Sequence, residues 1–130
     1  MQLRVKFSEF PEDQHTIVLQ SVLGRGKYTV YHAKGVSFDD SLALKVFSKS
    51  SSGKNHYARE KKILSQLNHK NVIAYVPILE HSLPYDILAT EYTPNGDFFD
   101  FVTQGGMRTE RLVRTYFHQL IQGIEHIHSQ

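Results

Sequence analysis

Three groups of residues in the first half of the chain have types and spacing that could bind a phosphorylated ligand. The first is a glycine-containing loop, which reads Val-Leu-Gly-Arg-Gly-Lys-Tyr-Thr-Val over residues 22–30. Glycine tolerates positive φ and close approach of the backbone, so Gly24 and Gly26 could direct N–H groups at phosphate oxygens. The pair alone is a weak signal, because a simple hairpin turn explains it more often.

Lys45 is the second group, and it lies inside an apolar segment, residues 42–47. Strand alternation places Ala43 and Lys45 on one face and the neighbouring leucines and valine on the other. A lysine in such a strand either extends its amine to water at a sheet edge or binds an anion, and neither alternative is favoured by the strand alone. Ala43 is small enough for a flat ring to lie against the sheet beside the lysine.

Glu60 is the third group. At helical spacing it shares a face with Ile63, Leu64 and Leu67. A carboxylate buried in an apolar stripe is costly unless it is paired, and a solvated face would carry its acids on the opposite side. We therefore predict an ion pair between Glu60 and Lys45.

The elements that must position these groups change character along the chain. Strands are predicted over residues 17–23, 29–34, 41–47, 73–79 and 86–92, and a Ser/Gly-rich linker over residues 48–55. Helices are predicted over residues 57–67, 97–102 and 112–127, the second closed by Gly105 and Gly106. The expected fold class is α+β: a five-stranded antiparallel sheet that carries one helix, followed by two helices.

Composition excludes several classes of protein. The 130 residues carry a net charge of +2 with mixed signs, which gives no indication of a nucleic-acid or membrane partner. The chain contains no cysteine, so disulfides, zinc–thiolate sites and thiol nucleophiles are excluded. No apolar run at the start is long enough for a signal peptide or a membrane span. The simplest interpretation is an intracellular protein, cytoplasmic or nuclear.

In this order, the loop, the lysine and the acid resemble the amino-terminal lobe of a eukaryotic protein kinase. Leu-Ala-Leu-Lys at residues 42–45 resembles the Val-Ala-Ile-Lys strand of that family. Arg-Glu-Lys-Lys-Ile-Leu at residues 59–64, followed by Leu-Asn-His-Lys-Asn-Val at residues 67–72, is similar to the family's glutamate-bearing helix and the segment after it.

The resemblance continues through the second half of the chain. Residues 89–100 resemble the hinge and the following short helix, and residues 114–129 resemble the helix that precedes the catalytic loop. The resemblance covers residues 17–130 and leans towards serine/threonine kinases of the calcium/calmodulin-dependent type. It implies an amino-terminal extension over residues 1–16, a small lobe over 17–92, and a hinge with two large-lobe helices over 93–130.

The resemblance further implies an ATP site. Leu23, Val30 and Ala43 would sandwich the adenine. Lys45 would bind the α- and β-phosphates and would be steered by Glu60.

The hinge would supply the rest of the site. Backbone groups of Glu91 and Thr93 would hydrogen-bond the purine edge, and Asp97 would reach the ribose. Thr90 would be a small gatekeeper, which implies access to a back pocket.

The glycine loop departs from the family pattern, Gly-x-Gly-x-x-Gly-x-Val. Here Gly26 is followed by Lys-Tyr-Thr and then Val30. Either the third glycine is deleted or Thr29 replaces it, and we favour the deletion because it keeps Val30 facing the ligand. Both alternatives make the loop shorter or stiffer, which affects how ATP is held.

The catalytic His-Arg-Asp and metal-binding Asp-Phe-Gly motifs of the family do not occur in these 130 residues. Magnesium and a protein substrate are therefore expected to bind only to a complete kinase domain. These 130 residues alone are expected to be inactive. No catalytic or metal-binding residue is assigned. His126 and His128 point to opposite sides of a helix and cannot chelate one metal.

The alternative to a portion of an active kinase is a naturally short, non-catalytic pseudokinase module that binds a partner protein.

The last predicted helix carries a long apolar stripe. Without a large lobe to cover it, this stripe is expected to find another protein surface. We predict self-association or a partner contact through residues 110–128. The stripe consists of Leu112, Val113, Phe117, Leu120, Ile124 and Ile127.

Overall fold

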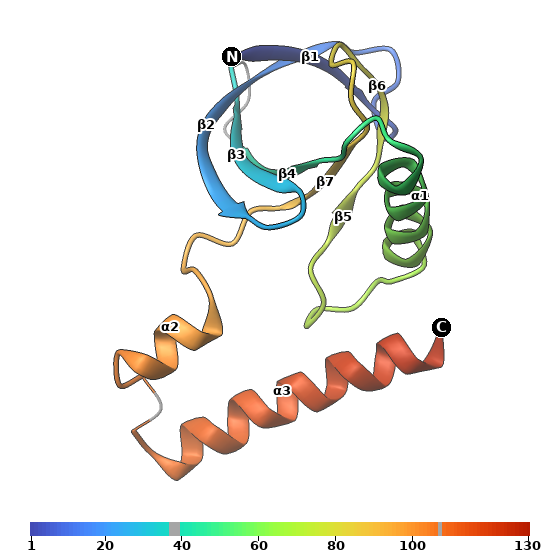
Figure 1. The fold of residues 1–130 in the computed structure, drawn as a ribbon. Helices are drawn as coiled ribbons and strands as arrows, with labels where there is room; N and C mark the ends of the chain where they lie inside the picture. The colour runs from blue at the N-terminus through green and yellow to red at the C-terminus, as the bar shows by residue number, and fades with distance from the viewer. Residues whose placement is uncertain (37–39, 107) are drawn as a thin grey trace. The chain divides into compact units, whose positions relative to one another are not determined.

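The computed structural model describes residues 1–36, 40–106 and 108–130. These residues form two compact units. The first unit comprises Met1–Gln66 and Ala74–Tyr92, and the second comprises Leu67–Ile73 and Thr93–Gln130. Figure 1 shows the strands and α1 in the first unit, and α2 and α3 in the second. The domain boundaries inferred from the resemblance stay predictions.

The first unit is built on one antiparallel sheet that curls round on itself (Figure 1). Its strand order is β5-β7-β4-β3-β2-β1-β6. The strands are β1 (Gln2–Phe7), β2 (His15–Arg25), β3 (Thr29–Gly35), β4 (Ser41–Val46), β5 (Tyr75–Val76), β6 (Ile78–His81) and β7 (Ile87–Glu91). The α+β class is confirmed, but the predicted count of five strands is wrong, because the sheet has seven.

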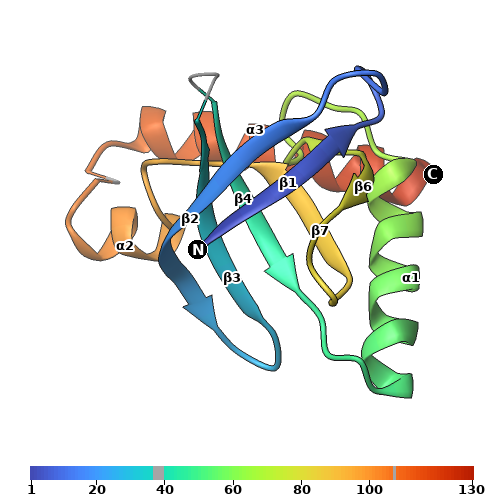
Figure 2. The same ribbon diagram turned by 90° about the horizontal axis from the view of Figure 1, so that it is seen from above.

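Two local features account for the extra strands. Gln2–Phe7 alternates polar and apolar residues, and Leu3 and Val5 are buried where β1 pairs with β2. Figure 2 shows β1 lying along β2. The single strand predicted over residues 73–79 is divided by Pro77, which has no N–H to donate to a ladder. The second part, β6, pairs instead with β1.

The main buried cluster of the first unit lies on one face of the sheet. Directly opposed residues of antiparallel strands share a face, so the pairing of Leu44 with Ala89 places both in this core. Each fully buried aliphatic side chain contributes about 1.5–3 kcal/mol. The buried cluster consists of Leu3, Val5, Ile17, Ala33, Leu42, Leu44, Ile87 and Ala89.

Helix α1 (Ser51–Ser65) begins inside the segment predicted to be a linker, so the linker over residues 48–55 is wrong. Ser50 is the N-cap, and its Oγ accepts a hydrogen bond from the Gly53 N–H at 3.0 Å. Serine is among the preferred N-cap residues because its side chain satisfies an unpaired backbone donor of the first turn. A serine-rich segment therefore starts a helix here instead of linking two elements.

The second unit contains α2 (Phe98–Thr103) and α3 (Glu110–Ser129), which confirms the two predicted helices. Gly105 closes α2 with a φ of 83°, a left-handed conformation that favours glycine. Residues 67–73 pack on α3, where the Asn71 side chain donates to the Gln119 carbonyl at 3.0 Å. The Asn68 N–H donates to Nε2 of His126 at 3.1 Å, so His126 has a packing role.

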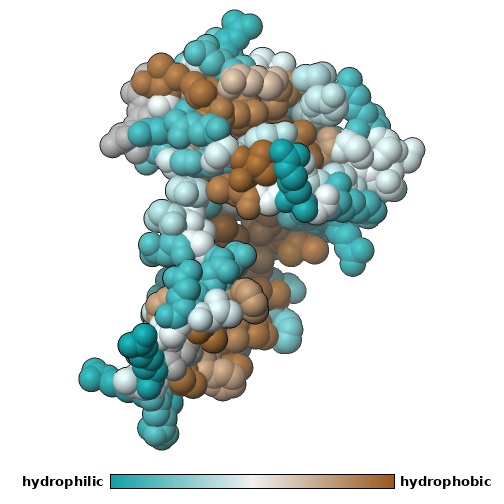
Figure 3. All heavy atoms as spheres, turned by 60° about the vertical axis from the view of Figure 1, so that its left-hand side comes forward, coloured by the Kyte–Doolittle hydropathy of each residue, from teal (hydrophilic) through white to brown (hydrophobic). Residues whose placement is uncertain are grey.

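Many apolar side chains of the second unit are exposed, and Figure 3 shows brown, apolar atoms at its surface. On α3, Phe117 is 60% exposed and Leu120 is 56% exposed. The predicted apolar stripe is therefore at the surface of this helix.

Candidate functional site

Lys45 and Glu60 form the predicted ion pair, with 2.9 Å between Lys45 Nζ and Glu60 Oε2. The expected burial of the carboxylate is wrong, because the Glu60 side chain is 37% exposed and Ile63 on the same helix is also exposed. An ion pair as exposed as this one contributes only about 0–1 kcal/mol to stability. Its value lies in holding the lysine amine at a fixed place where a ligand can still reach it.

The sheet brings further predicted residues to the face that carries Lys45. In the ladder between β3 and β4, Val30 lies opposite Lys45, and between β4 and β7, Ala43 lies opposite Thr90. Residues two apart in a strand also share a face, so Val30, Ala43, Lys45 and Thr90 lie on one side of the sheet. This is the side opposite to the main buried cluster, although Leu88, which pairs with Lys45, is also buried. The position of Val30 agrees with the interpretation that the third glycine is deleted.

The glycine loop differs from the expectation in its backbone conformation. Strand β2 continues to Arg25, Gly24 pairs with Val30, and the turn is confined to residues 26–28. Neither Gly24 nor Gly26 has a positive φ, so the argument from positive φ is wrong for both. A Cβ added at either glycine would meet no described atom within 4 Å. The glycines therefore leave open space next to the loop, where Leu23 is also exposed.

Two aromatic side chains, Tyr28 and Phe47, lie near Lys45, and the sequence did not predict this cluster. The amine lies 5.8 Å from the ring centre of Tyr28 and 5.2 Å from that of Phe47. The hydroxyl of Tyr28 is hydrogen-bonded to Nδ1 of His56 at 2.6 Å. The sequence signals were an aromatic residue two positions after the second glycine of the loop and a histidine one helical turn before Glu60.

The end of β7 holds the two hinge residues of the first unit. Thr90 is half-buried and lies between Ala43 and Tyr75. The Glu91 N–H donates to the Ala74 carbonyl at 2.9 Å, and the Glu91 carboxylate accepts from the Ala74 N–H at 2.8 Å. Because the N–H of Glu91 is occupied, its backbone can offer a purine only the carbonyl oxygen.

Thr93 and Asp97 belong to the second unit, and their part in the site stays a prediction. Asp97 is the N-cap residue of α2, and its side chain makes no capping hydrogen bond.

Among the described residues, no group of three or more His, Asp or Glu side chains is placed to hold a metal ion. In the same part of the chain, no helix is both long enough and apolar enough to cross a membrane.

Comparison with known proteins agrees with this geometry. Residues 17–130 match the protein kinase domain family. The chain is 31% identical over 117 residues to CBL-interacting serine/threonine-protein kinase 20 of Arabidopsis thaliana, covering 86% of this chain and 26% of that protein. It is 27% identical over 119 residues to NUAK family SNF1-like kinase 2 of Homo sapiens, covering 88% and 19%. It is 29% identical over 117 residues to serine/threonine-protein kinase SIK1 of Rattus norvegicus, covering 85% and 15%.

The chain thus spans about a quarter or less of the length of these relatives. The match nevertheless includes nearly all of the chain, from the glycine loop to α3. The chain belongs to the protein kinase family.

Proposed function

We propose that this chain is the ATP-binding portion of a serine/threonine protein kinase. The observation that carries the proposal is the Lys45–Glu60 ion pair on the same sheet face as Val30, Ala43 and Thr90. This arrangement offers a fixed cation for phosphate oxygens next to an apolar surface on which a purine ring can lie. The names of the relatives support the serine/threonine assignment.

The residues present fit ATP at each of these positions. The amine of Lys45 is held by one carboxylate oxygen and remains partly exposed, so it can also contact the α- and β-phosphates. The open space next to Gly24 and Gly26 would let phosphate groups come close to the backbone there. Leu23, Val30 and Ala43 would contact the adenine.

In a complete domain, ATP supplies the phosphoryl group that a serine or threonine hydroxyl of a protein substrate accepts. Magnesium would be held by the catalytic and Asp-Phe-Gly segments of such a domain, and neither motif occurs in these 130 residues. The 130 residues alone would bind nucleotide without transferring phosphate. The proposed activity places the protein inside the cell, in the cytoplasm or the nucleus.

The second candidate is a pseudokinase module that binds a partner protein. The observation that favours it is the short turn over residues 26–28, whose Tyr28 is attached to α1 next to Lys45. A partner contact, or self-association, would use the exposed apolar side chains of α3.

Thermal unfolding with and without nucleotide tests the first proposal. ATP at one hundred times its dissociation constant stabilises a protein by about 2.7 kcal/mol. We expect ATP to raise the melting temperature of the chain and to have no effect on Lys45→Met. Equal effects on both proteins, or none on either, would contradict the proposed site.

Phosphoryl transfer then separates the two candidates. It is measured in the protein encoded by the full reading frame, with a peptide acceptor. Transfer that Lys45→Met abolishes supports the kinase, whereas ATP binding without transfer supports the pseudokinase.

A further inference from the structure

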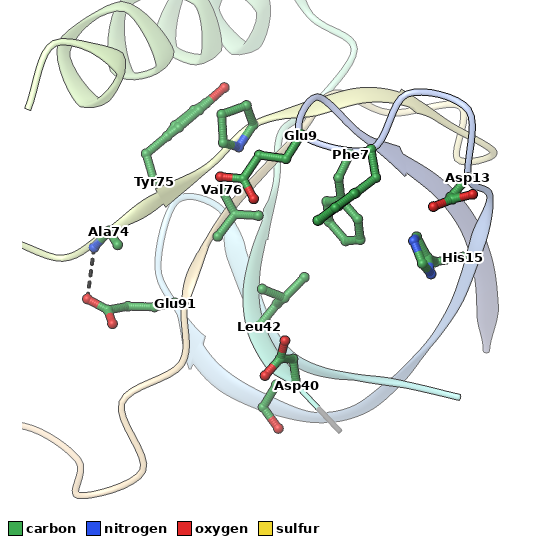
Figure 4. A pocket seen from close by; sticks show the side chains of 13 residues that line it. Phe7, Glu9, Asp13, His15, Asp40, Leu42, Ala74, Tyr75, Val76 and Glu91 are labelled. Carbon is green, nitrogen blue, oxygen red and sulfur yellow. Dashed lines mark hydrogen bonds between the residues drawn. The ribbon is translucent and has the colours of Figure 1, made fainter. Parts of the chain in front are cut away.

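A cavity of about 590 Å³ lies in the first unit, and Figure 4 shows the side chains that line it. Leu42 and Glu91 line it and lie directly opposite each other in the ladder between β4 and β7. They are each one residue away from Ala43 and Thr90, so their side chains point to the other face of the sheet. The cavity is therefore separate from the proposed ATP site.

One wall of this cavity comes from residues that precede the kinase-family match. Phe7, Glu9, Phe10, Asp13 and His15 line it, and the match begins at residue 17. Strand β1 and the loop after it are fixed by hydrogen bonds: the Ser8 N–H donates to the Pro77 carbonyl at 3.1 Å, and the loop closes on itself in two turns. The wall is thus a built part of the sheet and a feature of this chain, not of the matched domain.

The lining combines an apolar floor with negative charge. Phe7, Leu42 and Val76 supply apolar side chains. Carboxylates lie around them in Figure 4, on Glu9, Asp13, Asp40 and Glu91. The described lining residues include no lysine or arginine, and their one histidine, His15, contacts the Phe7 ring.

The volume and lining define the ligand that fits. Binding cavities for compact ligands have volumes of about 300–1,000 Å³ and mostly apolar walls with a few polar groups. Four like charges around one cavity raise its negative potential, which attracts cations. The carboxylates come from three separate segments, the loop after β1, the start of β4 and the end of β7, so a ligand with more than one cation could pair with them.

We propose that this cavity binds a short basic peptide segment of a partner protein, in which arginine or lysine residues flank an aromatic or aliphatic side chain. The apolar side chain fills the floor formed by Phe7, Leu42 and Val76. The flanking cations pair with carboxylates at the rim, on Glu9, Asp13 and Asp40. Binding does not depend on nucleotide, because the two sites are on opposite faces of the sheet.

The test uses the acetylated and amidated peptide Arg-Phe-Arg, which has no hydroxyl to be phosphorylated. We expect saturable binding by calorimetry, weaker at high salt, with amide resonance shifts at Leu42 and Val76. Replacing both arginines by citrulline, or the phenylalanine by glycine, should weaken binding at least about tenfold. Binding of the citrulline peptide with equal affinity would overturn the proposal.

Variants locate the site. The double substitution Glu9→Gln with Asp13→Asn changes exposed side chains only, and it should weaken binding of Arg-Phe-Arg at least about tenfold. Glu80→Gln removes an acid that does not line this cavity, and Lys45→Met changes the opposite face, so both should bind normally. Equal weakening in Glu80→Gln would show a general charge effect and overturn the site. Benzamidine binding as tightly as the peptide would overturn the peptide as its occupant.

Discussion

The hydroxyl of Tyr28 lies 2.6 Å from Nδ1 of His56, so the turn of the glycine loop is attached to helix α1. The Tyr28 ring also packs on Phe47, with 4.8 Å between ring centres. Lys45 is bonded to Glu60 on the same helix. The loop, β4 and α1 are therefore joined around one lysine, and the loop cannot move without breaking the contact between Tyr28 and His56.

A double-mutant cycle tests this attachment. Tyr28→Phe keeps the ring and removes the hydroxyl, and we expect it to lower the free energy of unfolding by about 0.5–1.5 kcal/mol. His56→Ala should lower the free energy of unfolding at least as much. The double variant should lose less than the sum of the two single losses, because each single variant already removes the one Tyr28–His56 hydrogen bond. Urea unfolding measures all four proteins, with the exposed Tyr85→Phe as the matched control. Strict additivity would show that the two side chains are not coupled.

Thr90 is predicted to control access to the space behind the purine. It is half-buried on the face of Ala43 and Lys45, so a longer side chain at this position would extend along that face. Thr90→Met should therefore weaken inhibitors that need the back pocket by at least about tenfold, while ATP, which does not need it, binds as before. Competition binding with one inhibitor of each kind measures the difference. Unchanged affinity for the back-pocket inhibitor would refute the role of Thr90.

The sequence was sufficient to predict the Lys45–Glu60 ion pair, because strand alternation and helical spacing are local rules that fix the side each residue faces. The resemblance to kinases implied only that Val30 faces the ligand, and the structure places it directly opposite Lys45. Burial of Glu60 was not predictable in this way. How much of a helix is covered depends on what packs against it, and here Ile63 is exposed too.

The failures concern contacts between distant or polar segments. Gln2–Phe7 alternates as a strand should, but its second partner, β6, lies more than seventy residues away, and local pattern cannot supply that pairing. The start of α1 was missed because its first turn is polar and has no apolar periodicity, so only the Ser50 cap marks it. The Tyr28–His56 bond joins two elements whose approach the sequence does not specify.

Gly53 is required by close packing at the start of α1. It is buried, and an added Cβ would overlap the backbone carbonyl oxygen and the Oγ of Ser48. Gly53→Ala should therefore destabilise the chain by about 1–3 kcal/mol, although alanine is the better helix former. Gly24→Ala is the matched control, because a Cβ there meets no described atom within 4 Å. Equal melting temperatures for the two variants would contradict this account.

The exposed stripe on α3 predicts concentration-dependent association. Phe117 and Leu120 are more than half exposed, and burying such side chains between copies would contribute about 1.5–3 kcal/mol each. Sedimentation of the chain should show a dimer or larger species, which Phe117→Glu with Leu120→Glu converts to monomer. Glu125→Gln, on the same helix, should leave the association unchanged. A monodisperse monomer with an ordered α3 would be the contrary result.

His81 makes stability depend on pH. It lies at the end of β6, where it pairs with Val5 of β1, and its Nδ1 is buried without a described hydrogen-bond partner. Burial lowers the pKa of His81 below 6.5, and this effect outweighs the opposing influence of the Asp86 charge. Protonation of the folded protein is therefore disfavoured relative to the unfolded chain.

The sign of the pH dependence follows from this lowered pKa. Between the folded and unfolded pKa values of His81, the unfolded chain binds more protons, so the free energy of unfolding falls as pH decreases. The contribution is complete above pH 6.5 and is lost as pH falls through the folded pKa, with a slope of at most about 1.4 kcal/mol per pH unit. Urea unfolding of the chain and of His81→Gln between pH 7.5 and about 5 should show a shallower slope for the variant. Parallel plots of the free energy of unfolding against pH would show that His81 has the same pKa in the folded and unfolded protein. A steeper slope for His81→Gln would show that folding raises this pKa instead of lowering it.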